Sequence, residues 1–110
     1  MATAQTPGAV STPATTKRSV RAATEYLFVH ELAPDFYEVY SEEGTAYTVD
    51  VRGPACECAD FEYRSEELGT DGCKHVRRVR MERGEIDVSP LFETDLRLDP
   101  LLIDAVADDQ

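Results

Sequence analysis

Lysine is nearly absent from this sequence: only Lys17 and Lys74 stand among its 11 basic residues, and the others are arginine. Long apolar runs are missing as well, and no stretch approaches the roughly 18 residues that a membrane-spanning helix needs. Residues 1–16 have no basic start followed by an apolar run, which a secretory signal would require. These absences predict a cytoplasmic protein without a membrane partner.

Basic residues are also few in relation to acidic ones. The chain has 22 aspartates and glutamates against 11 lysines and arginines, so its formal net charge is −11. A large acidic excess keeps a protein soluble where concentrated salt screens charge repulsion. Together with the scarcity of lysine, this balance leads us to hypothesise a halophilic archaeal host. An ordinary acidic protein is the alternative.

Cysteine is scarce, yet every cysteine falls into one pattern with one of the two histidines. The pattern is Cys56-x-Cys58, fourteen residues, and then Cys73-x-His75. Residues two apart in an extended segment point to the same side, so each pair can approach a single ion. Three thiolates and one imidazole are a ligand set that zinc takes in closed structural sites. Since three cysteines cannot all pair as disulfides within one chain, we predict a Zn²⁺ site formed by these four residues.

The sequence lacks the patterns of the common enzyme classes. The His-x-Glu and Pro-Cys-x-x-Cys elements of zinc deaminases are missing, and no carboxylate stands at ligand spacing to leave an open water position. There is no phosphate-binding glycine-rich loop, no Ser-His-Asp arrangement and no isolated pair of carboxylates in an apolar setting. We therefore predict a structural zinc ion in a protein that is not an enzyme.

Composition divides the chain into three parts. Residues 1–16 carry no charge and few large apolar groups, which predicts a disordered tail. Residues 17–90 are predicted to be the zinc-binding domain, with its core over 36–83, and 91–110 an acidic C-terminal tail whose leucines can pack back on the domain. Patterning predicts helices over 17–25, 60–68 and 74–83, and strands over 26–32, 36–40 and 45–51. The second and third strands form a hairpin, so the predicted fold class is α+β.

The residues around the cysteines resemble the SWIM zinc-finger domain, whose motif is Cys-x-Cys, a variable loop and Cys-x-His. Tyr37-Glu38-Val39 and Tyr47-Thr48-Val49 match the Tyr-x-Val strands of the family's hairpin, and Phe61 matches an aromatic residue after the second cysteine. The second pair reads Cys73-Lys74-His75-Val76, like the family's Cys-Lys-His followed by an aliphatic residue. The resemblance covers about 36–80 and is strongest to small stand-alone SWIM proteins of haloarchaea.

This resemblance implies a ββα arrangement, with zinc held between hairpin and helix by the four ligands. The N-terminal helix and strand and the flexible tails would be additions to that unit. The family is associated with binding to DNA and with protein–protein contact, so the resemblance implies a macromolecular partner of either kind.

The predicted helix over 74–83 is unusually basic for so acidic a chain. If Val76 and Val79 face inward, Lys74, Arg77 and Arg78 should point outward and could contact phosphates. The residues predicted to contact nucleic acid are Lys74, Arg77, Arg78 and Arg80. The alternative is a solvated face whose arginines pair with nearby acids.

These observations predict a non-enzymatic zinc-binding module that binds DNA through its basic helix. An adaptor that docks on another protein is the alternative, through apolar residues of the first strand or of the leucine-rich tail. Strand aromatics could stack on bases, although at strand spacing they more often form cross-strand pairs. His30 is expected to be a partly exposed strand residue, because the zinc ligand set is complete without it.

Overall fold

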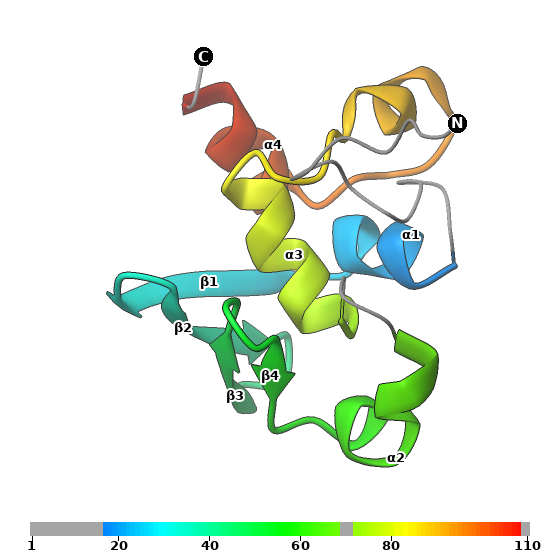
Figure 1. Ribbon diagram of the computed structural model, residues 1–110. Helices are drawn as coiled ribbons and strands as arrows, with labels where there is room; N and C mark the ends of the chain where they lie inside the picture. Colours follow the sequence, from blue (N-terminus) through cyan, green and yellow to red (C-terminus); the bar gives the residue numbers. More distant parts are fainter. Residues whose placement is uncertain (1–16, 69–71, 109–110) are drawn as a thin grey trace, which may run out of the picture.

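The computed structural model describes residues 17–68 and 72–108, and the statements below refer to that part of the chain (Figure 1). The elements in chain order are α1 (Lys17–Thr24), β1 (Leu27–Ala33), β2 (Phe36–Ser41), β3 (Ala46–Asp50), β4 (Ala55–Cys56), α2 (Ala59–Leu68), α3 (Lys74–Glu82), the 3-10 helix η2 (Ser89–Glu93) and α4 (Pro100–Asp108). The predicted α+β class is therefore confirmed. The predicted disordered tail, 1–16, lies outside the described residues. None of the described helices is long and apolar enough to cross a bilayer.

The strands form one antiparallel sheet in the order β1-β2-β3-β4. The predicted hairpin is formed by β2 and β3, where Tyr37 lies opposite Val49 and Val39 opposite Tyr47. The short strand β4 was not predicted, and it pairs with β3 so that Cys56 lies opposite Val49. The sheet thus places the first predicted zinc ligand beside the hairpin.

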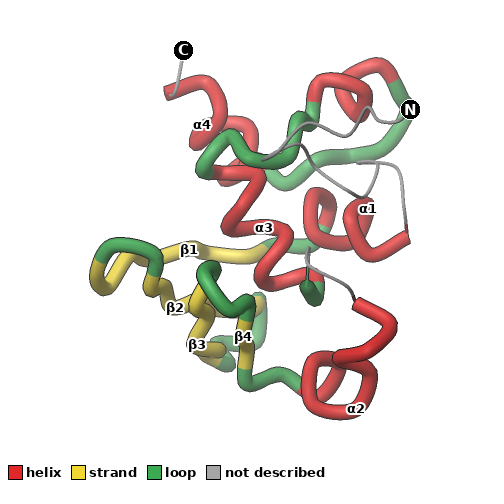
Figure 2. The backbone as a smooth tube through the Cα atoms, in the orientation of Figure 1, coloured by secondary structure: helices red, strands yellow, loops and turns green. Residues whose placement is uncertain are grey.

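Helix α3 covers the inner face of this sheet, as the backbone trace shows (Figure 2). Alternate strand residues point inward because successive side chains of a strand face opposite sides. With two valines of α3 they form the first buried cluster, which contains Leu27, Tyr37, Val39, Val49, Val51, Val76 and Val79 as well as Cys58 and Cys73. Two of the three cysteines predicted to bind zinc therefore belong to the apolar core, and Cys56 packs against it.

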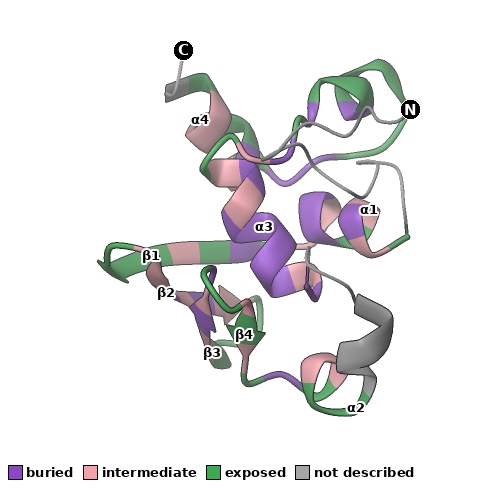
Figure 3. Ribbon diagram, in the orientation of Figure 1, coloured by how far each residue is buried: buried purple, intermediate pink, exposed green. Residues whose placement is uncertain are grey.

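A second buried cluster joins the C-terminal segment to α1 and to the end of α3 (Figure 3). It contains Ala22, Ala23, Met81, Ile86, Val88, Leu91, Leu98 and Leu102. The interpretation of 91–110 as a flexible tail is thus wrong for the described residues, because Leu91 and Leu102 are fully buried. The expected packing of leucines onto the domain holds for these two and Leu98, whereas Leu96 stays exposed.

Candidate metal centre

The four residues predicted to bind zinc lie together at one point between sheet and helix. Their ligand atoms all lie within 4.8 Å of one another. The Nδ1 atom of His75 is 3.7 Å from the sulfur of Cys56 and 3.8 Å from the sulfur of Cys73. A tetrahedral zinc ion with bonds of ~2.3 Å to sulfur and ~2.0 Å to nitrogen separates such atoms by roughly 3.6 Å. The residues present therefore fit a tetrahedral metal ion.

Three elements bring the ligands together. Strand β4 ends at Cys56, and Cys58 lies just before α2. Cys73 is the N-cap residue of α3, with extended backbone angles, and His75 lies in the first turn of that helix. The backbone N–H of Phe61 donates a hydrogen bond of 3.4 Å to the sulfur of Cys58. Amide donors of this kind stabilise thiolates, which are the form that binds a metal.

The three sulfurs affect one another's pKa because they are close together and partly or fully buried. Hydrogen bonds from the thiols of Cys56 and Cys73 lower the pKa of Cys58. The pKa of Cys56 is raised by its hydrogen bonds with Cys58 and Cys73 and by burial. The pKa of Cys58 is therefore lowered, while the pKa of Cys56 and of Cys73 is raised. Metal binding would release the remaining protons, so metal affinity should fall with decreasing pH.

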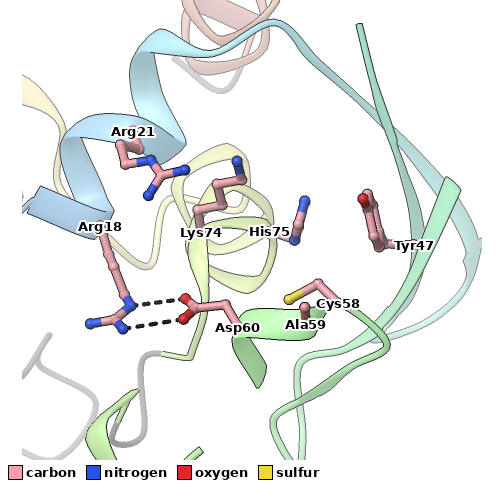
Figure 4. Close-up of a pocket in the computed structure, with 8 residues that line it drawn as sticks. All are labelled: Arg18, Arg21, Tyr47, Cys58, Ala59, Asp60, Lys74 and His75. Atoms are coloured by element: carbon pink, nitrogen blue, oxygen red, sulfur yellow. Dashed lines mark hydrogen bonds and ion pairs between the residues drawn. The ribbon is translucent and has the colours of Figure 1, made fainter. Parts of the chain in front are cut away.

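Side chains around the cluster keep water away from it. Cys73, Cys58 and His75 are at most 5% exposed, whereas Cys56 is partly exposed. The ring of Tyr47 stacks on that of His75 with centroids 4.3 Å apart, and Figure 4 shows the two rings beside Cys58. The sequence predicted strand packing for Tyr47, with base stacking as the alternative, and did not predict contact with a metal ligand. Its place in the Tyr-x-Val pattern, close to the ligands, is the signal that could have indicated this second role.

All four positions around a bound ion would be taken by protein groups. Such closed sites are structural, because a catalytic zinc keeps one position for water or substrate. The arrangement can therefore hold an ion and cross-link β4 to α3, and it offers no open coordination position for chemistry.

The basic helix does not present its arginines as predicted. The expectation that Arg77 and Arg78 point outward is wrong, because they are only 4% and 0% exposed. The prediction assumed that only the sheet covers α3, but α1 packs against another side of this helix. Arg77 donates to the carbonyl oxygen of Gly72 at 2.7 Å and to the hydroxyl of Ser19 at 3.1 Å. These two predicted nucleic-acid contacts are thus part of the interior.

The other two predicted contacts are partly exposed but paired. Lys74 lies 2.6 Å from a carboxylate oxygen of Glu25. Arg80 donates to the carbonyl oxygen of Val51 at 2.9 Å and lies 3.5 Å from Glu85. Lys74 and Arg80 thus pair with acids, as the alternative expected, but the helix face as a whole is not solvated, because Arg77 and Arg78 are buried.

Gly72, just before Cys73, occupies a position that no other residue would fill without strain. Its φ is +80°, and an added Cβ would lie 2.8–3.1 Å from the side chain of Val76. We expect Gly72→Ala to lower the free energy of unfolding by about 2–4 kcal/mol, from backbone strain plus overpacking. Urea unfolding of the zinc-loaded protein would measure this loss.

Gly44→Ala is the matched control for this substitution. Gly44 also has positive φ, +92°, but nothing lies within 4 Å of an added Cβ. Its variant should lose only the backbone term, about 1 kcal/mol. Equal losses in the two variants would show that contact with Val76 does not matter.

Comparison of the chain with protein-family models, with curated proteins and with solved structures finds no match. The resemblance to the SWIM domain therefore rests on the motif residues themselves.

Proposed function

We propose that this protein is a SWIM-type zinc-binding module without enzymatic activity, which binds another protein through the outer face of its sheet. The closed Cys₃His cluster carries the first part of this proposal, because its four ligand atoms lie within 4.8 Å of one another. Zinc is the expected ion, since thiolate-rich tetrahedral sites favour it. In this role the ion holds β4 to α3 and so keeps the sheet in a fixed shape.

The outer face of the sheet carries aromatic side chains that no described element covers. Phe28 on β1 is 49% exposed, and its ring centroid lies 6.1 Å from that of Tyr40 on β2. Phe36 and Tyr40 occupy the same side of β2 and are partly exposed. Contiguous exposed apolar surface on a small protein supports a docking role. β1 is also an edge strand, which offers unpaired backbone groups to a partner.

The charges on this face favour a protein over a nucleic acid. Outward positions of β1–β3 carry Glu38 and Asp50 but no lysine or arginine, and the cation that contacts them, Arg52, lies just beyond β3 and pairs with Asp50. A nucleic acid would need cations there to neutralise its phosphates. Electrostatic complementarity instead selects a partner segment that combines apolar and basic side chains.

DNA binding through the helix is the weaker candidate function. Its four expected contact residues are Lys74, Arg77, Arg78 and Arg80, of which two are buried and two paired with acids. For Arg77 and Arg78, contact with phosphates would require a buried side chain to become exposed. Concentrated salt would weaken such contacts further.

Phe28→Ser tests the proposed docking face. Affinity purification of the zinc-loaded protein from its native cells would be compared between wild type and variant. Any captured protein would be made separately and its dissociation constant measured. We expect about tenfold weaker binding for Phe28→Ser, because loss of a buried aromatic anchor costs more than 1 kcal/mol. The partner should have a basic surface, and binding should weaken with salt.

Phe92→Ser is the matched control, since Phe92 is 51% exposed but belongs to η2, at the second cluster. Equal loss of binding in both variants would contradict docking on the outer face. A mobility shift with DNA at native salt, abolished by Lys74→Ala, would instead support the DNA candidate. Sedimentation of the protein alone would reveal a partner that is a second copy of the chain.

A further inference from the structure

We propose that the cavity beside the metal centre binds the phosphate group of a small molecule. This site is distinct from the docking face of the proposed function. The cavity measures about 300 Å³ and lies between α1 and the first turn of α3. Figure 4 shows Arg18, Arg21 and Lys74 on one side of it and Tyr47 on the other. A phosphate group is far smaller than this volume, so there is room for the molecule that carries it.

Four of the chain's 11 basic residues gather at this one place. Arg18, Arg21 and Lys74 line the cavity, and Lys17 lines the adjoining hollow with Arg18 and Arg21. They come from two elements that are far apart in the sequence, since α3 begins more than 50 residues after α1 begins. In a chain of net charge −11, such a concentration of cations is unexpected, and binding of an anion would explain it.

Two carboxylates partly neutralise these cations. Arg18 donates to both oxygens of Asp60, at 2.9 and 3.2 Å. The carboxylate of Glu25 is shared, since it accepts from Lys74 at 2.6 Å and from Arg21 at 3.2 Å. Partial burial alone would raise the pKa of Glu25, but hydrogen bonds from Lys74 and Arg21 lower it. Glu25 lines the neighbouring hollow and not the cavity itself, so it would compete with an external phosphate for Lys74 and Arg21 without filling the cavity.

The loaded metal centre adds one more negative charge, because three thiolates outweigh a divalent cation by one. Four cations still exceed the combined charge of Asp60, Glu25 and this centre. Lysine and arginine bind phosphate oxygens by charge-assisted hydrogen bonds. The three cations of the cavity itself balance these three negative charges, and Lys17 in the adjoining hollow supplies the surplus. The cavity and the adjoining hollow together thus retain a net attraction for an anion.

The overall charge of the molecule favours a small anion over a polyanion. A single phosphate interacts mainly with groups within a Debye length, roughly 8 Å at physiological ionic strength. A long nucleic acid would also meet the acidic surface beyond the cavity, and the total of −11 would repel it. We therefore assign the cavity to a small phosphate ester or to free phosphate.

Titration of the zinc-loaded full chain would test this assignment, with inorganic phosphate, adenosine monophosphate and a twelve-nucleotide single strand as probes. Chemical shifts of the α1 and α3 amides would report binding at the cavity. We expect Lys74→Gln to weaken binding of the small probes about tenfold, the value of one charge-assisted hydrogen bond. Glu25→Gln should strengthen it several-fold, because it removes the competing carboxylate.

Opposite signs in these two variants separate a binding role from a structural one. Both substitutions break the same Lys74–Glu25 pair, so a merely structural pair would change both variants in the same direction. Arg52→Gln removes the same charge from an exposed position away from the cavity and should leave binding unchanged within twofold.

Three results would overturn the proposal. The first is the absence of saturable binding of either small probe. The second is an equal loss in Lys74→Gln and Arg52→Gln, which would reflect net charge alone. The third is tighter binding of the single strand than of both small probes, which would assign the cavity to a nucleic acid. Preference for adenosine monophosphate over inorganic phosphate would support an ester as the ligand, and the reverse would support free phosphate.

Discussion

Replacement of Cys58 by serine is expected to abolish stoichiometric zinc binding and to unfold the sheet half of the molecule. Cys58 is 5% exposed and belongs to the first buried cluster, so its sulfur serves both the ion and the core. Structural zinc sites supply on the order of 10 kcal/mol of apparent binding free energy. That is as large as the whole stability of a typical small domain, about 5–15 kcal/mol. Elemental analysis and amide hydrogen exchange of the purified variant would measure both effects.

Two features of the structure sharpen this expectation. Helix α3 contributes Val76 and Val79 to the first cluster and Met81 to the second, so it couples the two halves. Protection of the amides from exchange should therefore be lost first in β2, β3 and β4. The second cluster should also lose protection, because α3 contributes Met81 to it. Addition of a chelator to the wild type should reproduce the pattern.

His30→Ala is the control for the ligand assignment. His30 is the other histidine of the chain, and it lies exposed on β1 opposite Glu38. The variant should keep one equivalent of zinc and the stability of the wild type. One equivalent of zinc retained by Cys58→Ser, with the fold intact, would refute the proposed ligand set.

The ligand cluster could be predicted from the sequence because its information is local. Each pair is separated by one residue, and that spacing alone places two ligand atoms on one side of the chain. Only the closure of the cluster depends on tertiary structure. The hairpin was likewise predictable, since the alternation around Tyr37, Val39 and Val49 has the period of a strand.

The burial of the arginines could not be predicted in this way. A helical wheel identifies the face that carries Val76 and Val79, but it does not show that a second element covers another face. That element is α1, whose residues lie more than 50 positions away in the sequence from the arginines that contact them. An arginine is also compatible with burial only if its donors find acceptors, and the carbonyl oxygens concerned carry no sequence signal.

The packing of the C-terminal segment could not be predicted from the sequence for a related reason. Leu91, Leu98 and Leu102 are buried, yet they belong in turn to a 3-10 helix, an extended link and α4. Their spacing therefore has no single period. The acidic residues between these leucines led to the prediction of a tail. Most of these acidic residues lie on the surface, so they do not prevent the leucines from packing.

Arg78→Met is expected to destabilise the protein by roughly 3–5 kcal/mol, the cost of removing one partner from a buried ion pair. Arg78 and Asp99 are both buried and paired with each other. The same guanidinium donates to the carbonyl oxygens of Ala22, Glu25 and Leu27 at 2.9–3.1 Å. Asp99 in turn accepts from the backbone N–H of Leu27 at 3.0 Å. The variant would leave a buried charge and three carbonyl oxygens without this donor, and urea unfolding of the zinc-loaded protein would measure the loss.

Two comparisons separate this role from that of a surface cation. Arg52→Met breaks an exposed pair with Asp50 and should cost less than about 1 kcal/mol. Arg78 also lies 2.9 Å from Glu82, which is 18% exposed, so Asp99 is the fully buried carboxylate that loses its partner. Asp99→Asn in the Arg78→Met background removes that buried charge but keeps an oxygen for the N–H of Leu27. The double variant should therefore be more stable than Arg78→Met alone. If Arg78→Met instead kept wild-type stability and lost affinity for DNA, Arg78 would be a nucleic-acid contact after all, and its buried network would have no part in holding α1, β1 and α4 together.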